Sequence, residues 1–130
     1  MEGRIVISDE EQKENIPSYL RLRTRNTREG ILNAAKQCVC TDRENQYGQP
    51  ENNFGLIAGF WNNYLRAIMK NPDMRDVLSP DDVAAMMMLL KIARIATGEP
   101  KEDNWIDAAG YAACGGEIQG RKQQNNGQNE

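Results

Sequence analysis

Histidine is absent from the 130 residues, and cysteine occurs only three times. The lack of histidine excludes Ser-His and Cys-His nucleophile systems and histidine general bases. Cys38, Cys40 and Cys114 do not form a zinc motif, because "CVC" has neither a second cysteine pair nor a histidine to complete it. We therefore predict that the three thiols are small buried hydrophobes. If the protein is an enzyme, carboxylates with a hard metal ion are the obvious catalytic groups that remain.

Long apolar runs and a basic excess are also missing. No run approaches the ~20 residues that a membrane-spanning helix needs, and "MEGRIVISDEEQKEN" lacks the apolar segment of a signal peptide. We therefore expect no membrane partner and a cytoplasmic location. The net charge of −3 argues against a general nucleic-acid binder, so no nucleic-acid partner is expected.

One helical domain with two tails is predicted. Residues 1–25 are a charged arm whose arginine-rich end is either a solvated lead-in or an arm that closes over an anion. Residues 26–119 carry the helical patterns, and residues 120–130 are polar, low in complexity and predicted to be disordered. No repeat and no clear strand alternation is present. The predicted fold is therefore an all-α four-helix bundle with flexible N- and C-terminal tails.

Apolar periodicity and capping signals predict four helices. They span about residues 26–39, 50–68 and 79–97, and the last begins at residue 103 or 104. The third, "VAAMMMLLKIARIA", is apolar on all sides, so we predict that it is the central and most buried helix. In the fourth, Gly110 is predicted to allow close approach of a neighbouring helix, and the later glycine pair to loosen the helix end.

Two cations interrupt the apolar third helix. Lys91 and Arg94 lie one turn apart on one face, and burying a cation without a partner costs several kcal/mol. One interpretation is a structural network in which Asp107, with Asp82 or Glu44, neutralises them. The other is a pocket in which they bind phosphate. The two interpretations are compatible.

Other polar side chains could complete such a pocket. The fourth helix carries an amide, a carboxylate and a tyrosine on one stripe, and its first turn could bind a phosphate on free N–H groups. The connector "DRENQYGQPENNF" is also rich in ligand-binding side chains. Helix capping and ordinary solvated charge are the alternatives for these residues. The predicted ligand-binding residues are Arg43, Tyr47, Asn53, Lys91, Arg94, Lys101, Asn104, Trp105, Asp107 and Tyr111, and no metal ligand is predicted.

Three segments carry a resemblance: "DRENQYGQPENNFGLIAGFW", "SPDDVAAMMMLLKIARIATG" and "DNWIDAAGYAACGGEI". Over about residues 27–119 they resemble a family of small phage and prophage proteins, which is similar to the all-α NTP pyrophosphohydrolases of the MazG-like fold. The resemblance implies a MazG-like four-helix bundle and a homo-oligomer in the cytoplasm of the infected bacterial host. It also implies Mg²⁺-dependent hydrolysis of nucleoside triphosphates to monophosphates.

The carboxylates of the MazG-like metal motif are mostly missing here. Its ExxE falls on Lys91-Ile92-Ala93-Arg94, and its ExxD falls on Asn104-Trp105-Ile106-Asp107. Lysine and arginine cannot ligate Mg²⁺, but they can bind phosphate oxygens directly. The resemblance therefore implies a metal-free site that binds a nucleotide without the means to activate water.

Four functional hypotheses follow; the fourth is a nucleic-acid role of the arginine-rich arm, which would require salt-sensitive binding to DNA or RNA. The first is a phage protein, without a cofactor, that binds a phosphorylated nucleotide-like small molecule in a metal-free basic pocket and sequesters it; the molecule could be a host immune signal. The alternative is a divergent pyrophosphohydrolase with Mg²⁺ as cofactor, for which at least three acidic side chains must converge. The second alternative is a helical interaction protein without a ligand, with no open cavity beside Arg94. The acidic side chains of the enzyme hypothesis are Glu44, Asp82, Asp103 and Asp107.

Overall fold

Every regular element in the described part of the chain is a helix. The computed structural model describes residues 27–128, so the all-α prediction is confirmed over this range, and the predicted arm at residues 1–25 lies outside it. The elements are α3 (Arg28–Gln37), the π-helix η1 (Cys38–Asp42), α4 (Arg43–Tyr47), α5 (Pro50–Ile68), α6 (Pro80–Thr97) and α7 (Glu102–Gly127).

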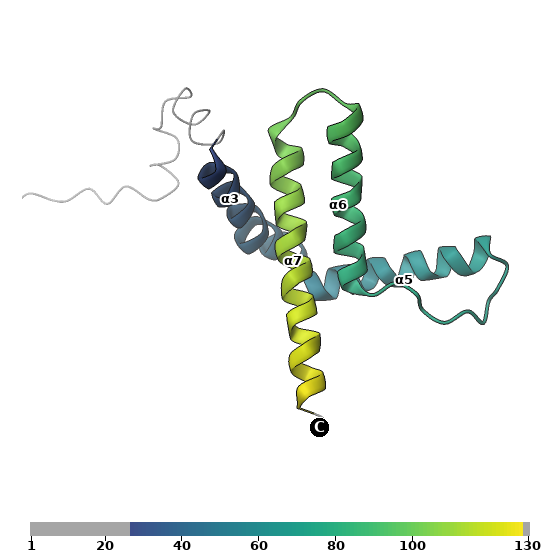
Figure 1. The fold of residues 1–130 in the computed structure, drawn as a ribbon. Helices are drawn as coiled ribbons and strands as arrows, with labels where there is room; N and C mark the ends of the chain where they lie inside the picture. The colour runs from purple at the N-terminus through teal and green to yellow at the C-terminus, as the bar shows by residue number, and fades with distance from the viewer. Residues whose placement is uncertain (1–26, 129–130) are drawn as a thin grey trace, which may run out of the picture.

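The helices α6 and α7 form an antiparallel pair to which the other helices are added (Figure 1). The helix α3 packs against α7, and α5 runs crosswise to the pair near the start of α6. The far half of α5 extends away from the pair (Figure 1). The four long helices therefore do not all run alongside one another within a single chain.

The start of α6 agrees with the prediction from "SPDD". Pro80 is the first helical residue, and the Ser79 N–H donates to Asp82 Oδ2 at 2.9 Å in a capping box. Lys122, from α7, donates to Ser79 Oγ at 3.0 Å and to Asp81 Oδ1 at 2.5 Å. The first turn of α6 is thus fixed both by its own cap and by the distant end of α7.

The C-terminal segment differs from the prediction. We predicted a disordered tail from residue 120, but α7 continues as a helix to Gly127. Arg121 pairs with Glu51 of α5 at 3.1 Å and with Glu117 at 2.9 Å. These ion pairs, with those of Lys122, join the segment to the body of the protein. The amino-acid composition of the segment does not indicate that these ion pairs form.

Glycines of α7 lie where other helices approach it closely. A Cβ atom on Gly110 would lie 2.8 Å from Val39 Cγ1, so only glycine permits this crossing with η1. The predicted role of Gly110 is confirmed. A Cβ atom on Gly115 would lie 3.0 Å from Ala84 Cβ on α6. Gly115 therefore serves packing, and α7 does not loosen there as predicted.

The core lies where α5, α6 and α7 meet, and α6 is less buried than predicted. On α6 only Val83, Ala84 and Lys91 are buried, because α7 covers one side and α5 crosses near its start. Of the three thiols, Cys114 is buried as predicted, whereas Cys38 and Cys40 are exposed. The core cluster consists of Phe54, Ala58, Val83, Ala84, Cys114 and Ile118.

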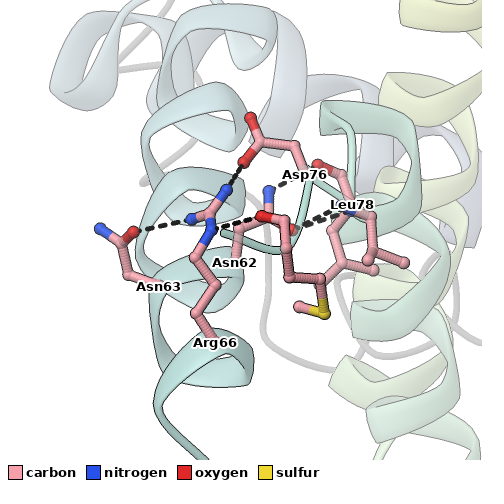
Figure 2. Close-up of polar contacts among 7 residues, drawn as sticks. Asn62, Asn63, Arg66, Asp76 and Leu78 are labelled. Carbon is pink, nitrogen blue, oxygen red and sulfur yellow. Dashed lines mark hydrogen bonds and ion pairs between the residues drawn. The ribbon is translucent and has the colours of Figure 1, made fainter. Parts of the chain in front are cut away.

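A buried asparagine on α5 holds the loop that leads into α6 (Figure 2). Asn62 is 2% exposed, and its Oδ1 accepts from the N–H groups of Val77 and Leu78, both at 3.0 Å. Its Nδ2 donates to the Leu78 carbonyl at 2.9 Å. Nearby, Arg66 donates to the Met74 carbonyl at 2.8 Å and pairs with Asp76. The loop is thereby fixed to α5, and α6 begins directly after it.

Candidate functional site

A cavity lies where the last turns of α6 meet the first turns of α7; we call it the turn cavity. It has a volume of about 440 Å³. Lysine and arginine on α6 face the start of α7 across it because the two helices are antiparallel and joined by a short connector. Half of the predicted ligand-binding residues therefore come together here. The lining is Lys91, Arg94, Thr97, Gly98, Glu99, Lys101, Asp103, Asn104 and Asp107.

Lys91 and Asp107 form an ion pair across the turn cavity. Lys91 Nζ lies 2.8 Å from Asp107 Oδ2, and Lys91 is buried. Within residues 27–128, neither of the other proposed partners of Lys91 takes part in an ion pair: Asp82 accepts from Ser79, and Glu44 lies on α4. The structural interpretation of Lys91 therefore holds, although Lys91 also borders the cavity.

Arg94 and Asn104 remain available in the turn cavity. The Arg94 side chain is exposed and makes no hydrogen bond or ion pair with any described residue. Asn104 is buried, yet its side-chain amide likewise has no partner in the described part of the chain. The N-cap of α7, Lys101, makes no side-chain capping bond to the first turn. The Arg94 guanidinium group and the Asn104 amide therefore border this cavity without a partner among residues 27–128.

The charges of the turn cavity are balanced, so the lining as a whole is not basic as predicted. The connector "TGEPKED" places acidic residues beside the basic ones. Lys91, Arg94 and Lys101 are matched in number by Glu99, Asp103 and Asp107.

A second cavity, which we call the Arg43 cavity, lies between η1, α4, α5 and α7. It has a volume of about 470 Å³. Gly48, with φ of 75°, ends α4 and turns the chain into α5, which brings α4 close to the start of α5. The lining is Cys38, Asp42, Arg43, Gln46, Tyr47, Asn53, Ile57 and Tyr111.

The predicted ligand-binding residues are thus divided between two separate cavities. Arg43, Tyr47, Asn53 and Tyr111 border the Arg43 cavity, and it shares no lining residue with the turn cavity. Trp105 borders neither: it is exposed and lines an apolar groove together with Leu32 and Met88.

The four carboxylates of the enzyme hypothesis do not converge. No group of three or more His, Cys, Asp or Glu side chains that could hold a metal ion occurs among residues 27–128. Asp82 caps the start of α6, whereas Asp103 and Asp107 lie at its other end, and the 18-residue helix is about 27 Å long. Glu44 lies on α4. The condition for the magnesium-dependent alternative is therefore not met within one chain.

Among residues 27–128, the surroundings shift the pKa values of Asp81 and Cys114. The hydrogen bond from Lys122, and next that from Ser79, lower the pKa of Asp81 below its usual value. Because this pKa is lowered, the stabilisation from the pair is present above the unfolded-state value of about 3.9 and is lost as pH falls through the folded-state pKa. Burial raises the pKa of the Cys114 thiol, so this cysteine stays protonated at neutral pH and is a core residue rather than a nucleophile.

None of the described helices combines the length and apolarity needed to cross a membrane. No solved structure matches the chain, so the MazG-like fold stays a prediction.

Comparison with known proteins identifies relatives in phages. The chain is similar to the Gene 55 protein of Mycobacterium phage L5, at 37% identity over 82 residues, which are 63% of this chain and 47% of that protein. It is 36% identical to the Gene 55 protein of Mycobacterium phage D29 over 86 residues, which are 66% of this chain and 51% of that protein. The chain therefore spans about half the length of the curated relatives it matches.

The family model for the domain of unknown function DUF6378 matches residues 30–119. The match includes the lining of both cavities. The predicted resemblance to small phage proteins is confirmed by these relatives, and the chain belongs to the DUF6378 family of phage proteins.

Proposed function

We propose that the turn cavity binds a phosphorylated, nucleotide-like small molecule without a metal ion. The observation that carries the proposal is that Arg94 and Asn104 border one cavity and have no partner among the described residues. A guanidinium group binds phosphate oxygens through two parallel hydrogen bonds, and an amide can bind ribose or base. A volume of about 440 Å³ is in the range of small-molecule sites.

The balanced charges of the turn cavity disfavour ligands that carry many negative charges. Glu99 and Asp103 would repel a polyanion such as a free triphosphate. They could instead accept hydrogen bonds from ribose hydroxyls or from the amino group of a base. Arg94 and Lys101 are then available for a phosphate. A ligand with few phosphate charges and several hydrogen-bond donors suits this lining better than a nucleoside triphosphate.

The proposed role is sequestration rather than conversion. Lys91, Arg94 and Asn104 stand where the resemblance to MazG-like enzymes would require carboxylates, and the remaining acidic side chains do not converge. Such a site holds a phosphate without activating water for its hydrolysis. Within a MazG-like bundle, in the cytoplasm of an infected bacterium, the useful outcome for a phage is withdrawal of a host immune nucleotide signal.

The Arg94→Gln variant tests this function. The purified protein is incubated with a panel of nucleotides, cyclic nucleotides and ADP-ribose-type signals, with and without Mg²⁺, then heated, and the supernatant is chromatographed. We expect one compound to be depleted and to return intact on heating, without Mg²⁺. Losing one charged hydrogen-bonding group should weaken its affinity roughly ten- to a hundred-fold in Arg94→Gln.

The matched control is Lys36→Gln, which removes one exposed cation of α3 outside both cavities. It should bind the ligand as tightly as the unmodified protein does. Conversion of a compound only in the presence of Mg²⁺ would instead support the pyrophosphohydrolase hypothesis. Equal affinities of Arg94→Gln and Lys36→Gln would mean that the ligand binds outside the turn cavity.

We also propose that the protein is a homo-oligomer. Two stripes of large apolar side chains, one on α5 and one on α6, are 40–66% exposed. Together they can supply roughly 800 Å², which is the area that each partner buries in a standard interface. Neither stripe carries a charge, so two identical copies can meet without like-charge repulsion. The stripes are Leu56, Phe60, Tyr64 and Ile68 on α5, and Met86, Leu89, Leu90 and Ile92 on α6.

Leu89→Glu should reduce the mass measured by light scattering from a multiple of 14.7 kDa to about 14.7 kDa. The side chain is exposed within one chain, so the helix itself should be preserved. Asn33→Glu places the same charge on an exposed position of α3 and should leave the mass unchanged. A 14.7 kDa species for the unmodified protein would contradict the oligomer.

A further inference from the structure

Arg43 lies over two neighbouring aromatic rings. Its guanidinium carbon lies 4.8 Å from the centre of the Phe54 ring and 5.2 Å from that of Tyr111. The two ring centres are 6.1 Å apart. The three residues come from α4, α5 and α7, so the packing of three helices fixes the position of one cation. Such cation–π contacts stabilise a guanidinium group but leave its charge uncompensated.

Arg43 also lacks an anionic partner. Unlike Lys91, it forms no ion pair or hydrogen bond with the residues from 27 to 128, and its Nε is buried without an acceptor. Asp42 borders the same cavity, but it lies outside ion-pair distance of Arg43 and accepts instead from Gln37 Nε2 at 3.4 Å. A partly buried cation without a counter-ion is unfavourable. The site is therefore electrostatically incomplete.

Arg43 lines the cavity, and no described residue pairs with the terminal nitrogens of its guanidinium group. The two terminal nitrogens donate no hydrogen bond within the described chain and, unlike Nε, are not shut off from solvent. Arg43 borders the cavity together with Gln46, Tyr47 and Asn53, whose polar side chains form no hydrogen bond with another described side chain. A planar guanidinium edge flanked by neutral donors matches a group with two negatively charged oxygens.

We infer that the Arg43 cavity is a second anion-binding site, which takes the phosphoryl or carboxylate group of a small organic molecule. The two terminal nitrogens of Arg43 bind two oxygens of the anion, and Asn53 and Gln46 donate to the remaining acceptors. The volume of about 470 Å³ admits a small organic molecule rather than a bare ion alone. The inference does not depend on the function proposed for the turn cavity, because no lining residue is shared.

Isothermal titration of the full chain tests this site with three probes: inorganic phosphate, ribose 5-phosphate and succinate. Ionic strength is kept constant with sodium chloride. We expect at least one probe to bind, and we expect Arg43→Gln to weaken it about ten-fold or more. Arg94→Gln, at the other cavity, should bind that probe like the unmodified protein. Binding of the two phosphates alone assigns a phosphoryl ligand, and binding of succinate alone assigns a carboxylate.

Two further variants keep the test decisive if Arg43→Gln does not fold. Arg43→Lys keeps the charge but loses the paired edge, and Asn53→Ala removes one neutral donor; both should bind more weakly than the unmodified protein. The inference is overturned if no probe binds, if both variants bind normally, or if binding is lost in Arg94→Gln instead.

Discussion

Replacing Asn62 with leucine is expected to lower the free energy of unfolding by about 3–5 kcal/mol, measured by urea denaturation. The asparagine side chain makes three hydrogen bonds to Val77 and Leu78 at 2.9–3.0 Å, and it is 2% exposed (Figure 2). Leucine has a similar volume but leaves two N–H groups and one carbonyl of this partly buried loop without their partners. Small domains are stable by only about 5–15 kcal/mol in total, so the variant should be largely destabilised.

Two controls separate these hydrogen bonds from general effects of substitution on α5. Asn63→Ala removes the neighbouring exposed amide, which accepts from Arg66 Nη1 at 2.8 Å, and should change stability by about 0.5 kcal/mol or less. Asn62→Asp keeps an acceptor for the two N–H groups but turns its second oxygen toward the Leu78 carbonyl. Protonation of that oxygen restores a donor, so its deficit relative to the unmodified protein should shrink as pH falls. A cost for Asn62→Leu equal to that of Asn63→Ala would contradict the loop-fixing role.

Replacing Asp107 with alanine is expected to lower the free energy of unfolding by about 2–3 kcal/mol, at or below the low end for breaking a buried ion pair. The reason is the unequal burial of the two partners. The side chain of Lys91 is 11% exposed and that of Asp107 is 35% exposed. Removing Asp107 therefore leaves a buried ammonium group without a partner.

The reverse substitution should be much milder. Lys91→Met leaves Asp107 where water can reach it, so we expect a cost of about 1 kcal/mol or less. The double variant Lys91→Met, Asp107→Ala should recover most of the loss of the single Asp107 change, because no buried charge remains. A double-mutant cycle by urea denaturation measures both effects. Equal costs for the two single variants would mean that the pair is effectively exposed to solvent.

The amino-acid sequence by itself determined the local features of this protein. The helix α6 begins after Ser79 and ends before Gly98, as the capping residues and the glycine predicted. Gly110 lies at a helix crossing as predicted. Such features depend on neighbours within a turn or two, or on the size of one residue. They can therefore be derived from sequence spacing alone.

The candidate site was only partly predictable. The sequence identified Asp107 as a potential partner of Lys91, because burying a cation without a partner is costly. It also placed all the candidate residues in one pocket, whereas the structure divides them among two cavities and the apolar groove at Trp105. Arg43 is partly buried and has no anionic partner among the described residues, but it lies in a polar connector where nothing in the local pattern indicated burial. Only its contacts with Phe54 and Tyr111 distinguish it.

Tertiary structure alone decided the surroundings of each helix. The apolar periodicity of α6 predicted cover on all sides, but α5 crosses near its start and leaves its outer face exposed (Figure 1). The polar composition of residues 120–127 predicted disorder, but Arg121 and Lys122 find acidic partners on α5 and α6. Periodicity records which face of a helix is apolar, and composition records how many charges a segment carries. Neither contains the distances between helices, and those distances decide which face is covered and which charge is paired.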